Sequence, residues 1–377
     1  MKLSTSLRTL AASALLVGIS GVSLAGAATT PPVAPTHALF VETDATAGNQ
    51  ILSYVRATDG TVSLAGTYKT GGKGAVAASA VADPLASQGG LLLARAGTRL
   101  VAVNAGSNTL SVFNVSGTSL QLLQQISSGG AFPNSLAASG SNVAVLNAGG
   151  QGTVVEYHWV NGLLAPIAGQ SRTLTLGNTT PPNFVAGPGQ VGYSPNGKFL
   201  VVADKKSTNN FTVFTVSATG VLGAGVTTAA QNAVPFAFNF ASNGDLVAAE
   251  ASNSSVSTYT IGATGALTPV GTVTDGAKAL CWITEARGYY FGSNAGSGTL
   301  SSFSVAADGT PTLVSATAAT THAGTTDDVT SPDGDFIYVE SGGAGALDVF
   351  AVSSQGALTP VETLWNIPVA SEGLAIS

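Results

Sequence analysis

The chain has 377 residues, of which only 8% are charged and 47 are glycine, and its formal net charge at pH 7 is −6. This acidic balance without a basic stripe excludes nucleic acids and anionic membrane surfaces as expected partners. The single cysteine, Cys281, excludes an internal disulfide, and its place in an alternating strand favours a buried small residue over a nucleophile.

The first 36 residues differ in composition from the rest. Lys2 and Arg8 precede an apolar run over 10–19, and an Ala-Gly-Ala site ends at Ala27. This pattern predicts a secretory signal peptide over 1–27. A retained membrane anchor is the alternative, although the run is short for a bilayer span. Residues 28–36 are predicted to form a linker. We therefore expect a secreted or periplasmic protein that meets a membrane only through an uncleaved signal segment.

From residue 37 onward the chain repeats a unit of turn, apolar strand, loop and second strand. In the clearest copy, 193–216, a Ser-Pro-Asn-Gly turn precedes the apolar strand. Each apolar strand ends in an acid or asparagine, and the seven end positions are Glu42, Asn104, Asn147, Asp204, Glu250, Asn294 and Glu340. Most steps are about 45 residues, which is the spacing of four-stranded blades. The sequence thus predicts an all-β, seven-bladed propeller over 37–377. A β-sandwich is the alternative, but it gives no reason for the repeated end residues.

The two ends of the repeat array complement each other. The first copy starts at 38–42 without an inner strand before it, whereas 371–377 follow the last outer strand and resemble the inner strand at 134–139. We expect residues 373–376 to supply the inner strand of the first blade and to close the ring, which removes exposed strand edges.

Two connections from an outer strand to the next inner strand are longer than a blade needs, namely 69–98 and 171–190. Such connections share one face of the disc with the strand ends listed above, so we expect functional groups to gather on that face. The Gly-rich stretch with lysines at 69–74 lacks the P-loop spacing and is predicted to be a plain loop.

The strand-end acids are the main candidates for chemistry. Asn and Asp at such positions commonly form local turns, whereas Glu is less suited to that role. Carboxylates crowded at a channel mouth would raise one another's pKa, which suits a general base, or would hold a cation. The candidate ligand-binding residues are Asp204, Lys205, Glu340, Gln190, Asp327 and Asp328. The three histidines show no metal-ligand spacing. We expect a monomer without a metal or cofactor, with a small molecule as the candidate ligand.

The repeat also resembles a known family. The segments SPNGKFLVVAD (194–204), SPDGDFIYVES (331–341) and GALTPVGTV (265–273) resemble the seven-bladed lactonases of YVTN-repeat type. That family includes bacterial 6-phosphogluconolactonases and fungal carboxymuconate-lactonizing enzymes. The resemblance implies lactone hydrolysis at one channel mouth by His, Arg and Glu. Here the His falls near Gly189 or Gln190, and the Pro-Arg-His segment reads Pro-Phe-Ala at 235–237. Only Glu250 matches.

Two functional hypotheses follow. The first is an exported lactonase-like hydrolase, acting on a sugar lactone or muconolactone, in which Glu250 is the general base and water the nucleophile. Its weakness is the missing cation for the developing oxyanion, for which Lys205 and Lys278 are the candidate substitutes. The second is a noncatalytic secreted propeller that binds a small ligand or a protein on its looped face.

Overall fold

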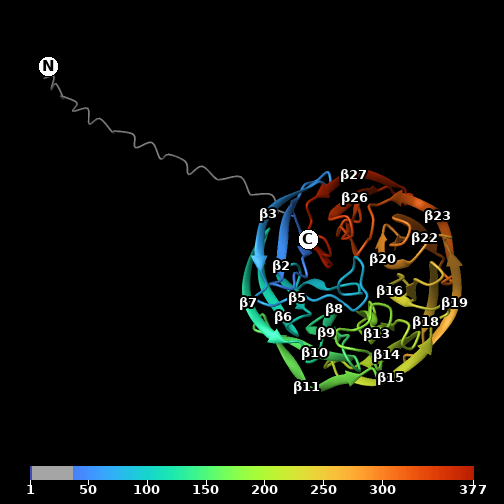
Figure 1. The fold of residues 1–377 in the computed structure, drawn as a ribbon. Helices are drawn as coiled ribbons and strands as arrows, with labels where there is room; N and C mark the ends of the chain where they lie inside the picture. The colour runs from blue at the N-terminus through green and yellow to red at the C-terminus, as the bar shows by residue number, and fades with distance from the viewer. Residues whose placement is uncertain (2–36) are drawn as a thin grey trace. The chain divides into compact units, whose positions relative to one another are not determined.

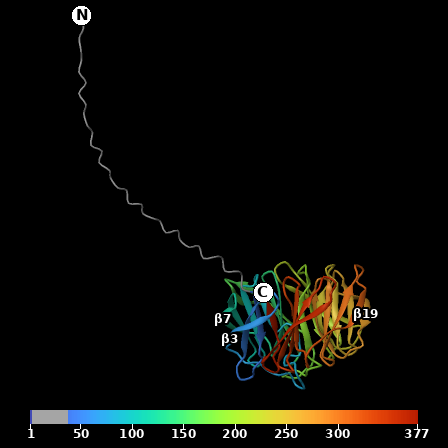
Figure 2. The same ribbon diagram turned by 90° about the horizontal axis from the view of Figure 1, so that it is seen from above.

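The computed structural model describes Met1 and residues 37–377, so the predicted signal peptide and linker lie outside the described residues. Residues 37–377 form a seven-bladed β-propeller, which confirms the predicted fold. Figure 1 shows the blades as a ring around one axis, and Figure 2 shows the same ring from its edge. No helix in the described part of the chain has the length and apolarity to cross a bilayer.

Each blade is an antiparallel sheet of four strands, from the axis to the rim. From the first blade to the seventh, the inner strands are β28 (Leu374–Ile376), β4 (Leu91–Ala94), β8 (Pro133–Ser139), β12 (Pro188–Tyr193), β16 (Pro235–Phe240), β20 (Leu280–Ala286) and β24 (Asp327–Thr330). The second strands are β1 (His37–Glu42), β5 (Arg99–Asn104), β9 (Asn142–Asn147), β13 (Phe199–Asp204), β17 (Leu246–Glu250), β21 (Tyr289–Asn294) and β25 (Phe336–Ser341). The third strands are β2 (Gln50–Arg56), β6 (Thr109–Ser116), β10 (Thr153–Val160), β14 (Asn210–Val216), β18 (Ser255–Ile261), β22 (Thr299–Val305) and β26 (Ala346–Val352). The outer strands are β3 (Val62–Lys69), β7 (Ser119–Ser127), β11 (Leu163–Thr173), β15 (Leu222–Ala229), β19 (Leu267–Thr274), β23 (Pro311–Thr320) and β27 (Leu358–Trp365).

Burial explains why the second strands are continuous apolar runs while the outer strands alternate. A second strand such as β13 packs against neighbouring blades on both faces, so nearly all of its side chains are buried. An outer strand such as β15 alternates between half-buried and exposed side chains. The core therefore consists of apolar layers between adjacent blades, for example the layer of Leu39, Val41, Tyr338 and Leu347 between the first and seventh blades.

The C-terminal strand closes the ring as predicted. β28 pairs antiparallel with β1, with Leu39 opposite Ile376 and Val41 opposite Leu374. Asp327 at the start of β24 accepts a hydrogen bond from Leu374 N at 2.9 Å, so the closing strand is also tied to the seventh blade. Closure thus joins the first blade to the seventh through both backbone pairing and a carboxylate.

Two strand ends, in the first and seventh blades, depart from the predicted alignment of the repeats. In the first blade Glu42 pairs with Ile51, the counterpart of Leu300 and Leu347, so Thr43 takes the repeated end position. In β21 the last residue, Asn294, pairs with the residue five positions later, Thr299. In the seventh blade the residue with this pairing is Ser341, opposite Ala346. Glu340 comes one position earlier, so its side chain points to the other face of the sheet. The repeat therefore places Ser341, and not Glu340, at the position equivalent to Glu250 and Asn294.

Candidate functional site

A segment between the first and second blades fills the middle of the ring. Residues 75–88, which we call the plug, belong to the connection from β3 to β4. Figure 1 shows this light-blue connection crossing the centre of the ring. The side chains of Leu85, Ala86 and Ser87 are at most 2% exposed. The sequence predicted a long loop on this face, but not that the loop would close the mouth of the channel.

The plug is hydrogen-bonded to inner strands of several blades. Ser87 Oγ donates to Asn134 O of the third blade at 2.6 Å, and Gln88 N donates to Gly189 O of the fourth at 2.9 Å. On the other side, Trp282 Nε1 of the sixth blade donates to Ser87 O at 2.7 Å. A loop with this many partners around the axis is part of the closed fold and not a surface excursion.

The second long connection packs on the plug. Its irregular part is 174–187, shorter than the expected 171–190, because β11 and β12 extend further than the sequence indicated. Ala78 N donates to Pro182 O at 2.8 Å, and Phe184 N donates to Ala78 O at 2.9 Å. The two long connections therefore close one mouth of the channel together.

Lys205 follows β13 and reaches the plug with its ammonium group. Its Nζ donates to Ala86 O and lies 4.4 Å from the ring centroid of Phe236 and 5.2 Å from that of Phe184. The side chain is fully buried. Burial lowers the pKa of Lys205 to about 8, while the nearby carboxylate of Asp83 favours the charged form. A predicted ligand residue thus lies at the channel mouth, between aromatic faces and carboxylates.

Six buried carboxyl groups lie around the plug and near one another. They come from the first blade, the plug and the seventh blade, and are Glu42, Asp44, Asp83, Asp327, Glu340 and Glu372. We call them the acid cluster. Burial raises the pKa of each one, and repulsion from a neighbouring acid adds to the rise for all except Asp83. Glu372 accepts hydrogen bonds from Leu85 N at 2.8 Å and from Ser87 Oγ at 2.9 Å, so the cluster holds the plug directly.

Several oxygens of the acid cluster have no hydrogen-bond partner among the described residues. Both carboxyl oxygens of Glu340 are buried and unpartnered, as is one oxygen each of Glu42, Asp44 and Asp83. A buried ionised oxygen without a partner is costly, so the protonated form is favoured. In the described part of the chain, no three His, Cys, Asp or Glu side chains are arranged to hold a metal ion.

Two further predicted acids each accept a side-chain hydrogen bond. Asp328 adjoins Asp327 of the cluster, whereas Asp204 lies in the fourth blade and its second oxygen has no partner among the described residues. Asp328 accepts a hydrogen bond from Ser293 Oγ at 2.6 Å, and burial raises the pKa of Asp328 to about 7. Asp204, next to Lys205 in the chain, accepts one from Thr212 Oγ1 at 2.9 Å, and burial raises the pKa of Asp204 to about 7. Both groups therefore change charge near neutral pH.

Glu250 has a different environment. Its carboxylate accepts hydrogen bonds from Ser257 Oγ at 2.5 Å and Tyr259 OH at 2.8 Å, and from Asn232 Nδ2 at 2.8 Å and Ser255 Oγ at 3.2 Å. All four donors belong to the fifth blade or to the connection before it. No hydrogen bond links Glu250 to the plug or to Glu340 in the described structure. Its role as a general base stays a prediction.

Gln190 also makes a structural contact. Its side-chain oxygen accepts a hydrogen bond from Phe238 N at 2.6 Å, which joins the inner strands of the fourth and fifth blades. A ligand-binding role for Gln190 stays a prediction as well.

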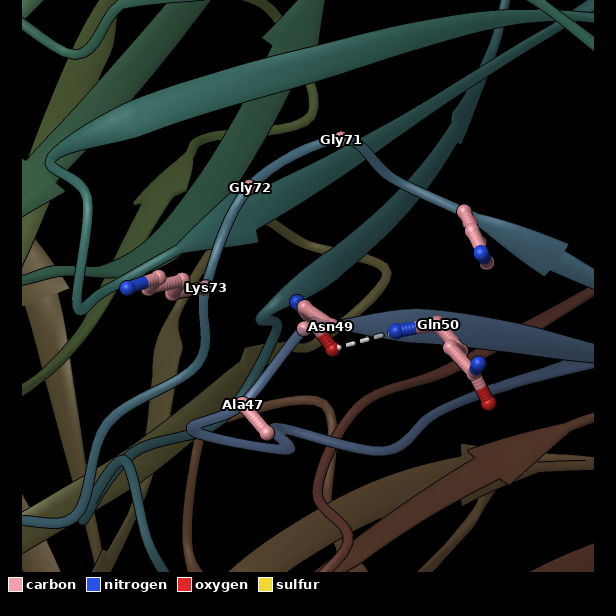
Figure 3. A pocket seen from close by; sticks show the side chains of 8 residues that line it. Ala47, Asn49, Gln50, Gly71, Gly72 and Lys73 are labelled. Atoms are coloured by element: carbon pink, nitrogen blue, oxygen red, sulfur yellow. Dashed lines mark hydrogen bonds between the residues drawn. The ribbon is translucent and has the colours of Figure 1, made fainter.

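A surface pocket of about 460 Å³ lies at the edge of the same face. Its wall includes Asn49, whose Nδ2 donates to Glu42 of the acid cluster at 2.6 Å. Figure 3 shows Asn49 and Gln50 on one side of the pocket and the side chain of Lys73 pointing away from them. The pocket therefore borders the acid cluster through Asn49, while the side chain of Lys73 points away from that contact.

The residues that sequence reasoning missed are Asp44, Asp83 and Glu372. They lie in connections, outside the repeated strand-end position, so no periodicity marked them. The one available signal was Glu372, a single acid directly before the strand predicted to close the ring.

Comparison with protein-family models gives a match to the description "Lactonase, 7-bladed beta-propeller" over residues 164–281 and 247–364. These overlapping matches span more than half of the chain. No curated protein matches the sequence significantly.

Solved structures share the fold at low sequence identity. A Bacteroides fragilis protein titled as a candidate 6-phosphogluconolactonase has a TM-score of 0.72 at 19% identity and covers 91% of this chain and 98% of its own. The periplasmic gluconolactonase of Pseudomonas aeruginosa has a TM-score of 0.70 at 19% identity, with 90% and 98% covered. A Lactobacillus plantarum protein has a TM-score of 0.69 at 19% identity, with 91% and 99% covered.

Proposed function

Because the chain belongs to the lactonase family of seven-bladed β-propellers, we propose that it hydrolyses a lactone at the plugged mouth of its channel. The substrate class is a sugar lactone or a muconolactone. The observation that carries the proposal is the place of Lys205, a cation at the channel mouth among carboxylates. Lys205 would supply the cation for the developing oxyanion, whose absence was the weakness of the hydrolase hypothesis drawn from the sequence.

The need for a cation follows from the reaction. When water attacks the lactone carbonyl, the carbonyl oxygen becomes an oxyanion, and stabilising that charge is usually the largest part of catalysis. Lys205 is buried among Phe184, Phe236 and the plug, where a charge acts through a low dielectric. The aromatic faces also offer an apolar surface to the lactone ring.

A carboxylate beside Lys205 is better placed as the base than Glu250, since base and cation must reach the same substrate. Asp83 is the acid that acts most strongly on Lys205. In the proposed reaction the carboxylate of Asp83 takes a proton from water, and the water oxygen bonds to the carbonyl carbon. The ring C–O bond then breaks, the ring oxygen receives the proton, and the product is an open hydroxy acid.

Access requires a movement of the plug. Lys205 is fully buried and its ammonium group donates to Ala86 O, so the closed form leaves no room for a substrate there. Turnover therefore needs an open form in which the plug leaves the mouth, as lids do in other enzymes.

The test is hydrolysis of glucono-δ-lactone and a muconolactone by the purified protein, followed by proton release above the uncatalysed rate. We expect Lys205→Met to lower kcat/KM at least about 100-fold, the range found when one group that stabilises an oxyanion is removed. Lys206→Met is the matched control, because Lys206 is the next residue and is exposed. An unchanged rate in Lys205→Met, or no hydrolysis of any lactone by the wild type, would overturn the proposal.

A noncatalytic binding propeller is the second candidate, and the filled mouth favours it. The segment aligned with the family's Pro-Arg-His carries Phe236, which packs edge-on against Trp282 at 5.1 Å between ring centroids. Binding of a lactone or hydroxy acid without turnover, measured by calorimetry, would support this candidate over the hydrolase.

We further propose that the protein is exported. The proposal rests on the signal-peptide pattern of residues 1–27 and is in keeping with the periplasmic relative in Pseudomonas aeruginosa. N-terminal sequencing of the secreted protein should give a start near Ala28. An intact Met1 in a membrane fraction would indicate an anchor instead.

A further inference from the structure

The plug is flanked by glycines that can act as hinges. Gly71 precedes it with φ of +84° and Gly89 follows it with φ of +87°, a region that other residues rarely adopt. Short glycine segments at both ends let a loop swing as a unit while the strands on either side stay in place.

Some of the hydrogen bonds that hold the plug come from groups that titrate. Glu372 accepts hydrogen bonds from Leu85 N and Ser87 Oγ, and Lys205 Nζ donates to Ala86 O, while within the plug Asp83 accepts one from Ala86 N at 2.6 Å. Ala77, Leu85 and Ala86 of the plug are also buried in the apolar layer between the second and third blades. The charge state of the surrounding acids acts on the closed form in addition to this packing.

The groups that face the plug come from every element packed around it. The acids are Glu42 and Asp44 after β1, Asp83 in the plug, Asp327 and Asp328 of β24, Glu340 of β25, and Glu372 before β28. The other titratable groups are Lys205 after β13, Cys281 of β20 and Tyr54 of β2. One cation therefore faces seven acids, and the third and fifth blades contribute the uncharged Asn134 and Phe236.

We propose that residues 75–88 are a proton-controlled plug, which closes the channel while the acid cluster is protonated and opens when the cluster ionises. As a regulation of the proposed reaction centre, this inference rests on the proposed function. The opening itself involves no substrate and can be measured without one.

The sign of the pH dependence follows from the direction of the shifts. In the closed form the acids have raised pKa values, while in the open form they return to about 4. The closed form is therefore fully stable below about pH 4 and loses stability as the pH rises through the closed-form values. Lys205, whose pKa is lowered to about 8, acts in the opposite direction above that pH. The opening should grow between pH 5 and 8.

Cys281 is a natural reporter of the opening. It is the only cysteine of the chain, is 5% exposed, and lies near Asp83 and Lys205. The probe is a thiol reagent such as 5,5′-dithiobis(2-nitrobenzoate), applied from pH 5 to 8. Dividing the rate by that of a free peptide with the sequence 279–284 removes the intrinsic ionisation of the thiol. The ratio reports the open fraction, and global unfolding is measured in parallel by circular dichroism in urea.

We expect the open fraction to rise about 10-fold per pH unit for each proton released. In Glu372→Gln the opening should release one proton fewer, so the slope of the logarithm of the open fraction against pH should fall by one. Glu340→Gln should do the same, and it keeps the test valid if Glu372→Gln does not fold, because Glu340 makes no hydrogen bond with its carboxyl group. Asp308→Asn, which removes an exposed acid in a distant turn, should leave the slope unchanged.

A flat ratio in the wild type, an unchanged slope in Glu340→Gln, or labelling at the rate of global unfolding would each overturn the inference. If the protein hydrolyses no lactone but its open fraction shows the expected slopes with pH, the plug inference stands and the proposed function is overturned. If the protein hydrolyses a lactone but the labelling ratio of Cys281 does not change with pH, the proposed function stands and the plug inference is overturned.

Discussion

Two glutamates of second strands, Glu250 at the end of β17 and Glu340 one residue before the end of β25, lie in opposite environments although both are completely buried. Glu250 accepts four hydrogen bonds from its own blade and the connection before it, while neither oxygen of Glu340 has a partner among the described residues. Glu156 is intermediate, because Tyr193 OH alone reaches its two oxygens, at 2.7 and 2.6 Å. The three buried acids thus differ in how many hydrogen-bond donors their carboxyl groups meet.

The difference separates acids that are hydrogen-bonded within one blade from acids that are buried without a donor. A carboxyl group with four donors fixes the loop around it through its hydrogen bonds. A buried carboxyl without donors is stable only when protonated, so its environment depends on pH and on the segments that cover it. For Glu340, the neighbouring acids are Asp327, Asp44 and the plug's Asp83.

The largest expected effect comes from removing the closing strand. Deleting residues 371–377 removes both β28 and Glu372, so β1 becomes an exposed edge and the plug loses two hydrogen bonds. We expect the melting temperature to fall by at least about 10 °C, measured by circular dichroism. Removal of Ser377 alone is the control, since it leaves all of β28. Equal melting temperatures for the two deletions would contradict closure as a source of stability.

The fold could be predicted from sequence because its signals are local and repeated. The turn, apolar strand and polar end recur about every 45 residues, and the missing first inner strand indicated closure by the C-terminus. The alignments of Glu42 and Glu340 were wrong by one position, because Thr43 and Ser341 stand where the other five blades carry an acid or amide.

The candidate site could not be predicted to the same degree, since its contacts are long-range. Leu85 and Glu372 are 287 positions apart and meet only because the ring closes around the plug. Lys205 could be named as a candidate from its place after a strand-end acid, but its position against Ala86 depends on the plug. No pattern within one blade contains that information.

A smaller effect is expected at the well-partnered glutamate. Glu250→Ala leaves the buried hydroxyl groups of Ser257 and Tyr259 without their acceptor, and we expect a loss of about 3 kcal/mol in the free energy of unfolding. The loss is measured by urea unfolding. Asn253→Ala, at an exposed position beside Asn232, is the control. A loss below about 0.5 kcal/mol would mean that the hydrogen bonds around Glu250 do not stabilise the fold.

The smallest effect, and one of opposite sign, is expected at Glu340. Replacing it with Met removes an acid that has no hydrogen bond at its carboxyl group and that repels Asp327, Asp44 and Asp83 when ionised. The pKa of Glu340 is raised by burial first and by those acids second, so the wild type loses stability as the pH rises through that raised value. Glu340→Met lacks this acid and therefore does not lose that stability as the pH rises. It should therefore match the wild type near pH 4 and exceed it by about 1 kcal/mol at pH 8, measured by urea unfolding at both values. A variant less stable than the wild type at pH 8 would show that Glu340 has a stabilising partner when ionised, and the contrast with Glu250 would no longer hold.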